Sequence, residues 1–159
     1  MKKKVRKNGL WVLLFLVIVL LCITAPLYAV YSPTEVDLGS VLQKPNAAHW
    51  FGTDRFGRDL FTRVLYGARI SLMVGIVTAV INTIIGVIYG GIAGYVGGRV
   101  DMWMMRLTDI LYSIPELLYI ILIMLIFGSN VRSIIIGVCV AGWISMARMV
   151  RSQIITLKE

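Results

Sequence analysis

The sequence has few charged residues and few of the side chains that build metal or disulfide sites. Charged residues make up 15% of its 159 residues, whereas a soluble domain carries about 25%. Its two cysteines, Cys22 and Cys139, both lie inside apolar runs, and its single histidine, His49, has no cysteine nearby. This pattern argues against a disulfide framework and against a Cys/His metal centre, so we expect no metal site.

Catalytic motifs are also missing from the sequence. It contains no GxxxxGK[ST] phosphate-binding loop, no HExxH and no nucleophile elbow. We therefore predict that the chain is not an enzyme and binds no cofactor of its own. Glu116 and Asp109 are the only acids placed to serve an intramembrane proton relay. Both lie near predicted membrane interfaces, and Glu116 follows Pro115, where an acid is favoured at the start of a helix.

The sequence is rich in long uncharged hydrophobic runs. Hydrophobic residues make up 58% of the chain and the mean hydropathy is +0.85. A buried soluble core is the alternative, but runs of this length are typical of membrane spans. The net charge of +8 does not indicate nucleic-acid binding, because the basic residues cluster at the ends of the runs. We predict an all-α, polytopic transmembrane helical protein with about four spans.

The first half of the chain divides into three segments. Residues 1–9 form a basic N-terminus, and residues 10–30 form the first transmembrane helix, about 31 Å long and sufficient to cross a bilayer. A signal peptide is the alternative, but this apolar segment exceeds the usual length of about 7–15 residues. Residues 31–69 are polar and predict a loop outside the membrane. Helical spacing of apolar residues in its second half predicts an interfacial helix with an Asp59–Arg63 pair.

Residues 70–159 form the remaining transmembrane part. Residues 70–98 are uncharged and predict the second span, in which Gly86, Gly90 and Gly94 recur every four residues and allow close helix packing. Asn82 lies mid-span, where it faces either a translocation pathway or a neighbouring helix. Residues 99–112 predict an interfacial helix with an Arg106–Asp109 pair. Runs at 117–131 and 133–147 predict a hairpin of the third and fourth spans.

The distribution of positive charge predicts the orientation. With a cytoplasmic N-terminus and four spans, ten basic residues fall inside and six outside. The positive-inside rule therefore favours a cytoplasmic N-terminus and an extracellular loop at residues 31–69.

Three ordered motifs resemble the permeases of dipeptide, oligopeptide and nickel ATP-binding-cassette importers. The first runs through His49-Trp50-Phe51-Gly52-Thr53-Asp54-Arg55-Phe56-Gly57-Arg58-Asp59 and resumes at Arg63-Val64-Leu65-Tyr66-Gly67-Ala68-Arg69. The second joins Gly94-Tyr95-Val96-Gly97-Gly98 to Asp101, Arg106, Asp109 and Pro115. The third is Gly142-Trp143 followed by Ala147-Arg148 and Arg151. The Gly142–Arg148 stretch resembles the oligopeptide branch most.

The resemblance implies a function and a set of partners. It implies half of a translocation pathway, completed by a second homologous permease and driven by two ATP-binding subunits that bind ATP, with an extracellular binding protein that delivers peptide. Its candidate site residues are Gly52, Thr53, Asp54, Gly57, Arg58, Asp59, Gly67 and Arg69 before the second span, and Asp101, Arg106, Asp109, Pro115, Arg148 and Arg151 on the cytoplasmic side. The loop motif either contacts the binding protein or is structural, with Asp54 capping a helix and Gly57 permitting a turn.

Members of this family are about twice as long, with six spans and an ATPase-docking Glu-Ala-Ala loop that would follow Glu159. We therefore expect the chain to be the N-terminal part of a permease in a bacterial plasma membrane, and without that loop not to couple to ATP hydrolysis. The alternatives are a non-functional remnant, a non-transporting membrane scaffold and an ion-coupled carrier. The carrier would require ionisable residues at mid-span, and only neutral polar residues occur there.

Overall fold

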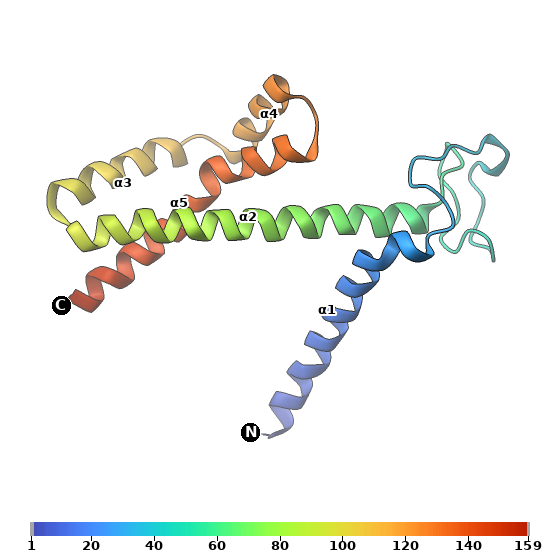
Figure 1. Ribbon diagram of the computed structural model, residues 1–159, viewed down its shortest axis with the longest axis horizontal. Helices are drawn as coiled ribbons and strands as arrows, with labels where there is room; N and C mark the ends of the chain where they lie inside the picture. Colours follow the sequence, from blue (N-terminus) through green and yellow to red (C-terminus); the bar gives the residue numbers. More distant parts are fainter. Residues whose placement is uncertain (1, 159) are drawn as a thin grey trace. The chain divides into compact units, whose positions relative to one another are not determined.

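The computed structural model describes residues 2–158, with side chains from residue 9 onward. It confirms the all-helical fold class. The elements are α1 (Lys2–Tyr28), the short 3-10 turn η1 (Leu38–Ser40), α2 (Leu60–Val96), α3 (Gly98–Tyr112), α4 (Glu116–Phe127) and α5 (Val131–Lys158) (Figure 1). The chain divides into two compact units, Met1–Leu72 and Met73–Glu159, and α2 continues from the first into the second.

The first unit contains α1, the polar loop and the first turns of α2. Residues Gly9–Tyr28 of α1 form a candidate span of 20 residues. Its large apolar side chains are exposed all around the helix, from Leu10 and Trp11 to Leu20 and Ile23. A helix that is apolar on every side needs an apolar surrounding, which a bilayer supplies.

The loop differs from the prediction in its second half. No separate interfacial helix forms there: the backbone stays irregular through Phe56, and α2 begins at Leu60. Gly57 explains the late start, because its φ of +73° lies in the left-handed region that interrupts a right-handed helix. The apolar residues from Leu60 to Leu65 therefore belong to the first turns of α2 itself.

The second unit begins within α2 and turns back sharply. α2 has 37 residues, about 55 Å at 1.5 Å per residue. It ends at Val96, and the positive φ angles of Gly97 (+68°) and Gly98 (+56°) reverse the chain into α3. α3 ends at Tyr112 with Ser113 as its C-cap, and Pro115 precedes α4, as the sequence indicates.

The third and fourth spans differ from the predicted hairpin of two equal runs. α4 has only 12 residues, about 18 Å, which is too short to cross a hydrocarbon core of about 30 Å alone. It satisfies the length and hydropathy of a span only together with α3, from which it is bent by 74°. α5 is longer than predicted, because its 28 residues run without a break through Arg148 and Arg151 to Lys158.

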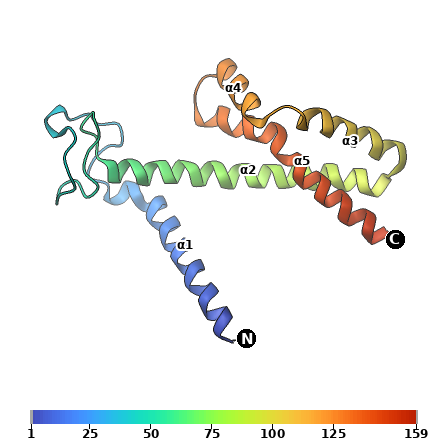
Figure 2. The same cartoon turned by 180° about the vertical axis from the view of Figure 1, so that it is seen from behind.

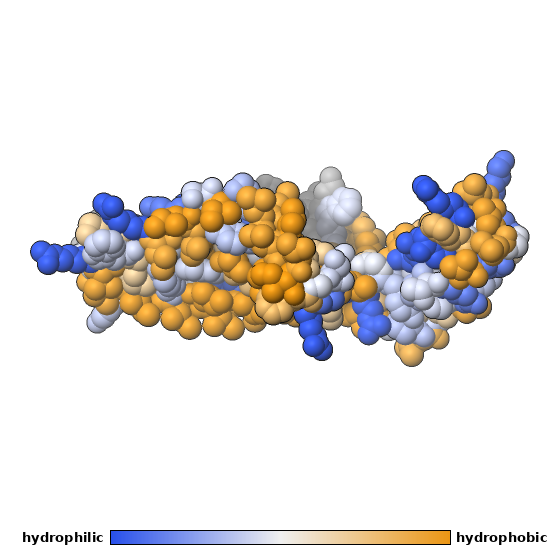
Figure 3. All heavy atoms as spheres, turned by 90° about the horizontal axis from the view of Figure 1, so that it is seen from above, coloured by the Kyte–Doolittle hydropathy of each residue, from blue (hydrophilic) through white to orange (hydrophobic). Residues whose placement is uncertain are grey.

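The core of the second unit lies where α5 packs on α2 and α3. Trp143, Ile144 and Ala147 of α5 are buried, with Tyr89 and Leu111 packed against them. Figure 2 shows α5 crossing the C-terminal part of α2 at an angle. The residues described include three helices long and apolar enough to cross a membrane, or four if α3 and α4 form one bent span. Figure 3 shows hydrophobic residues over most of the visible helical surface, as expected for a lipid-facing protein.

Candidate functional site

Asp54 organises the loop motif before α2. Its carboxylate accepts hydrogen bonds from the backbone N–H of Phe56 at 2.8 Å and of Arg58 at 3.1 Å. The Arg58 guanidinium donates to it at 2.8 Å and 2.7 Å, and Arg63 also pairs with it. Asp54 therefore ties a tight turn to the first turn of α2 rather than capping the helix.

Two glycines in the motif adopt backbone angles that other residues rarely adopt. Gly52 and Gly57 both have a φ of +73°. A Cβ atom at Gly52 would overlap the backbone of Gln43, and one at Gly57 would overlap the backbone of Asp37. Both positions need glycine for conformation and for space, so this part of the motif holds the loop in shape.

Asp59, which the sequence pairs with Arg63, has different partners in the structure. Its carboxylate accepts a hydrogen bond from the Thr62 N–H at 2.7 Å, which makes it the N-cap of α2. It also lies 3.0 Å from Nδ1 of His49. Both side chains are buried, and Tyr31 stacks on the His49 ring with centroids 4.7 Å apart. The i,i+4 prediction was wrong because Arg63 turns toward Asp54, whose carboxylate is already fixed by the turn.

His49 was not among the predicted site residues. Its burial depends on the fold of the loop, since ten residues separate it from Asp59. A lone histidine in a polar segment carries no periodic signal, so sequence reasoning had no means of placing it.

Hydrogen bonding holds both loop carboxylates in the charged form. Burial opposes ionisation of Asp54, but the Arg58 side chain and the N–H groups of Phe56 and Arg58 outweigh it and hold its pKa well below the ordinary 3.8. Burial likewise opposes ionisation of Asp59, and hydrogen bonds from Thr62 and His49 lower its pKa overall. A carboxylate with a lowered pKa stabilises the folded loop above the unfolded pKa, and this stabilisation is lost as the pH falls through the folded pKa.

We therefore expect the loop to stay folded from pH 7 to about pH 4 and to open only in more acidic solution. The measurement is hydrogen exchange of the amides at the start of α2, corrected for the intrinsic rate at each pH. Asp54→Asn keeps the side-chain shape but removes the charge that faces Arg58 and Arg63. It should lower amide protection several-fold at pH 7 and flatten the acid decline. Loop opening above pH 5 in the unmodified chain would contradict this account.

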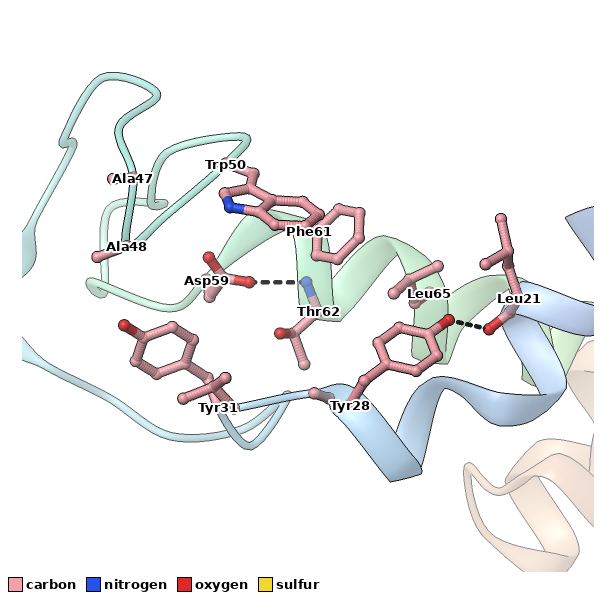
Figure 4. A pocket seen from close by; sticks show the side chains of 12 residues that line it. Leu21, Tyr28, Tyr31, Ala47, Ala48, Trp50, Asp59, Phe61, Thr62 and Leu65 are labelled. Atoms are coloured by element: carbon pink, nitrogen blue, oxygen red, sulfur yellow. Dashed lines mark hydrogen bonds between the residues drawn. The ribbon is translucent and has the colours of Figure 1, made fainter.

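A pocket of about 860 Å³ lies beside the buried pair in the first unit. Figure 4 shows it between the end of α1, the loop and the first turns of α2, with Trp50 and Phe61 on one side and Tyr28 and Tyr31 on the other. Its lining is mostly apolar, and Asp59 already bonds Thr62 and His49. The pocket thus offers packing surface but no free charge for recognising a polar ligand.

The last two motif residues before the second span lie apart from this cluster. Gly67 is helical and has no neighbouring atom within 4 Å of a Cβ position, and Arg69 is exposed. Both lie on α2 beyond the loop contacts. The structure brings Gly52, Thr53, Asp54, Gly57, Arg58 and Asp59 together and leaves these two outside.

The glycine repeat on α2 faces α5. A Cβ at Gly86 would lie 2.9 Å from the Trp143 carbonyl oxygen, and one at Gly94 would lie 3.0 Å from that of Arg151. At Gly90 it would overlap the backbone of Ala147. The two helices thus approach so closely that only a hydrogen atom fits between them at these positions.

Asn82 lies in the same contact between α2 and α5, one turn before Gly86. The structure places it against Gly142 of α5, where any side chain at Gly142 would overlap the Asn82 amide. Of the two alternatives for Asn82, this is the contact with a neighbouring helix. Its Oδ1 is buried without a hydrogen-bond partner among the residues described.

Two ion pairs join α3 to α5. Arg151 forms a two-pronged pair with Asp101, and Arg148 donates to Asp109 at 2.8 Å. The predicted Arg106–Asp109 pair was wrong, because Arg148 reaches Asp109 from the neighbouring helix and Arg106 stays exposed. Four of the six cytoplasmic-side candidates thus meet in one interface, whereas Arg106 and Pro115 do not take part in these pairs.

Comparison with known proteins identifies relatives along nearly the whole chain. Residues 86–159 match the family described as binding-protein-dependent transport system inner membrane component. The dipeptide transport system permease protein of Bacillus subtilis (strain 168) is 47% identical over 158 residues, covering 99% of this chain and 49% of the relative. The oligopeptide transport system permease proteins of Bacillus subtilis and of Escherichia coli (strain K12) are 44% and 46% identical over 92% of this chain, covering 48% and 49% of their own lengths.

The chain thus spans about half the length of the curated relatives it matches. Dipeptide and oligopeptide permeases match it at similar identities, so the comparison does not separate the two branches. Together with the candidate spans, these matches make the chain part of a multi-pass membrane protein.

Proposed function

We propose that the chain belongs to the family of binding-protein-dependent transport system inner membrane components and forms the N-terminal part of a permease subunit in an ATP-binding-cassette importer for peptides. The observation that carries the proposal is 40–47% identity to dipeptide and oligopeptide permeases across nearly the entire chain. A scaffold without transport activity would not require this likeness along the loop motif, the glycine contact and the α3–α5 interface together.

In this proposal the chain contributes structure to a pathway and does no energetic chemistry. ATP is bound by two partner subunits, a second homologous permease completes the pathway, and an extracellular binding protein delivers peptide. The geometry supports a structural role for the second unit, because close α2–α5 packing and two α3–α5 ion pairs hold three helices as one body. A stiff body of this kind transmits a rigid movement better than a loose one.

The proposed orientation places the N-terminus and the α2–α3 turn in the cytoplasm and the loop cluster outside. It is supported by the basic N-terminus and by the larger number of basic residues on the inside segments. The rigid, charged turn around Asp54 would then face the binding protein, as a contact surface or as a support for one.

A chimeric permease tests the proposal. Residues 1–159 replace the matching half of the Bacillus subtilis dipeptide permease in a strain that lacks its own, and dipeptide uptake is measured. A second chimera uses the C-terminal half of the oligopeptide permease and tests oligopeptide uptake. We expect at least one chimera to give more peptide uptake than the C-terminal half of the permease expressed alone. A chimera that inserts stably in the membrane but gives no uptake with either peptide class would reject the proposal and favour a non-functional remnant.

A further inference from the structure

One face of α3 carries two arginines and two large apolar residues whose side chains are exposed. Arg99, Trp103, Arg106 and Ile110 follow one another at spacings of four, three and four residues, which places them on the same side of a helix. All four are exposed, Trp103 by 67% and Ile110 by 63%. We call these four residues the α3 basic face.

The acids of α3 do not neutralise this face. Asp101 lies toward α5, where Arg151 binds it with two hydrogen bonds, and Asp109 at the edge of the face pairs with Arg148 at 2.8 Å. Thr108, opposite the face, is completely buried. Among the residues with described side chains, Arg99 and Arg106 have no ion-pair partner, so the face presents two uncompensated positive charges.

The position of the face in the chain places it at a membrane boundary. α3 starts at Gly98, directly after the long apolar helix α2 has ended at Val96. Lys158 donates a hydrogen bond to the Tyr95 carbonyl oxygen at 2.7 Å and adds a further cation at this end. Arginine beside exposed tryptophan on an amphipathic helix is the composition that favours the headgroup region.

We propose that the α3 basic face binds anionic phospholipid headgroups. Each guanidinium can donate two parallel hydrogen bonds to a phosphate, and Trp103 and Ile110 lie beside them to contact the upper acyl chains. Charge complementarity selects this occupant, since a zwitterionic headgroup offers no net charge to the two arginines. Each basic residue near an anionic surface favours binding by about 5-fold, so both arginines together favour it by roughly 30-fold at most.

Fluorescence quenching of Trp103 by brominated lipid tests the proposal. The full chain carries Trp11→Phe, Trp50→Phe and Trp143→Phe, so that Trp103 is its only tryptophan. It is reconstituted in phosphatidylcholine bilayers with either brominated phosphatidylglycerol or brominated phosphatidylcholine. We expect stronger quenching by the anionic lipid, and a preference that falls as salt is added. Equal quenching by the two lipids would overturn the proposal and leave the face to an acidic protein partner.

Charge variants distinguish an effect of the α3 basic face on lipid preference from an effect of the overall charge of the chain. Arg99→Gln with Arg106→Gln should abolish the preference, whereas Arg99→Lys with Arg106→Lys should retain most of it. Arg55→Gln with Arg132→Gln removes the same charge at two other exposed positions and should leave Trp103 quenching unchanged. A preference that survives in the Arg99→Gln/Arg106→Gln chain also overturns the proposal.

Because Trp143 lies in the core, its replacement carries a risk of misfolding. Native mass spectrometry of the chain with all four tryptophans provides the second measurement. It compares retained phosphatidylglycerol with retained phosphatidylcholine in the unmodified chain and in the Arg99→Gln/Arg106→Gln chain. Retention of the anionic lipid should fall several-fold in the variant, and equal retention would contradict the proposal.

Discussion

Gly90→Leu is expected to separate α2 from α5 and to destabilise the second unit by about 3 kcal/mol. Even a Cβ atom at this position overlaps the backbone of Ala147, so the helix axes must move apart. Rotation of a side chain cannot relieve the overlap, because the atoms that it meets belong to the α5 backbone. The separation would also loosen the contact between Tyr89 and Trp143, whose ring centroids lie 4.7 Å apart.

The matched control is Gly75→Leu on the same helix. Gly75 is exposed and has no neighbouring atom within 4 Å of a Cβ position, so leucine there meets open space. Replacing glycine in a helix with leucine gains several tenths of a kcal/mol in helix propensity. Unfolding of both variants by SDS titration from a mild detergent measures the difference. The close-contact account fails if the two substitutions have the same effect, and peptide uptake by the chimera should fall more than 10-fold for Gly90→Leu alone.

Reversing the charge of Asp101 is expected to have the second largest effect. Asp101→Arg places two guanidinium groups where Arg151 now binds a carboxylate, in an interface where the Asp101 side chain is 14% and the Arg151 side chain 32% exposed. Breaking a buried pair costs about 3–5 kcal/mol. Partial exposure reduces this, so we expect a loss of about 1–3 kcal/mol. Arg151→Asp should cause a similar loss.

Combining the two substitutions should recover most of the stability, because the pair is restored with its ends exchanged. A double-mutant cycle in the SDS titration measures the coupling between the two residues. The Asp109–Arg148 pair provides the comparison: its side chains are 68% and 39% exposed, so its reversal should cost less than about 1 kcal/mol. Additive losses at Asp101 and Arg151, with no recovery in the double variant, would show that each residue acts through other contacts.

Sequence reasoning succeeded where the physical signal is local or depends on length. The apolar run at residues 10–30 corresponds to the span Gly9–Tyr28, since a run of that length has few alternatives to crossing a bilayer. The spacing of Gly86, Gly90 and Gly94 indicated close helix packing, but it could not name α5 as the neighbour, because a spacing describes one helix only.

Charge pairing was the least predictable feature. Both pairs expected from spacing, Asp59–Arg63 and Arg106–Asp109, are replaced by pairs with residues from elsewhere in the fold. An i,i+3 or i,i+4 pair contributes only about 0.2–0.5 kcal/mol. A carboxylate already fixed by a turn, or an arginine supplied by a packed helix, readily outcompetes such a pair.

The sequence alone determined that this protein is helical and membrane-spanning, because the length and hydrophobicity of its runs leave the backbone polar groups no other way to be satisfied in lipid. It also indicated the resemblance to peptide permeases, through motifs whose order is visible without coordinates. Tertiary structure decided the partners: Asp59 with His49, Asp101 with Arg151, and the glycines of α2 with the backbone of α5. These contacts bring together residues that are far apart in the chain or that lie on different elements, and only the folded chain determines which of them meet.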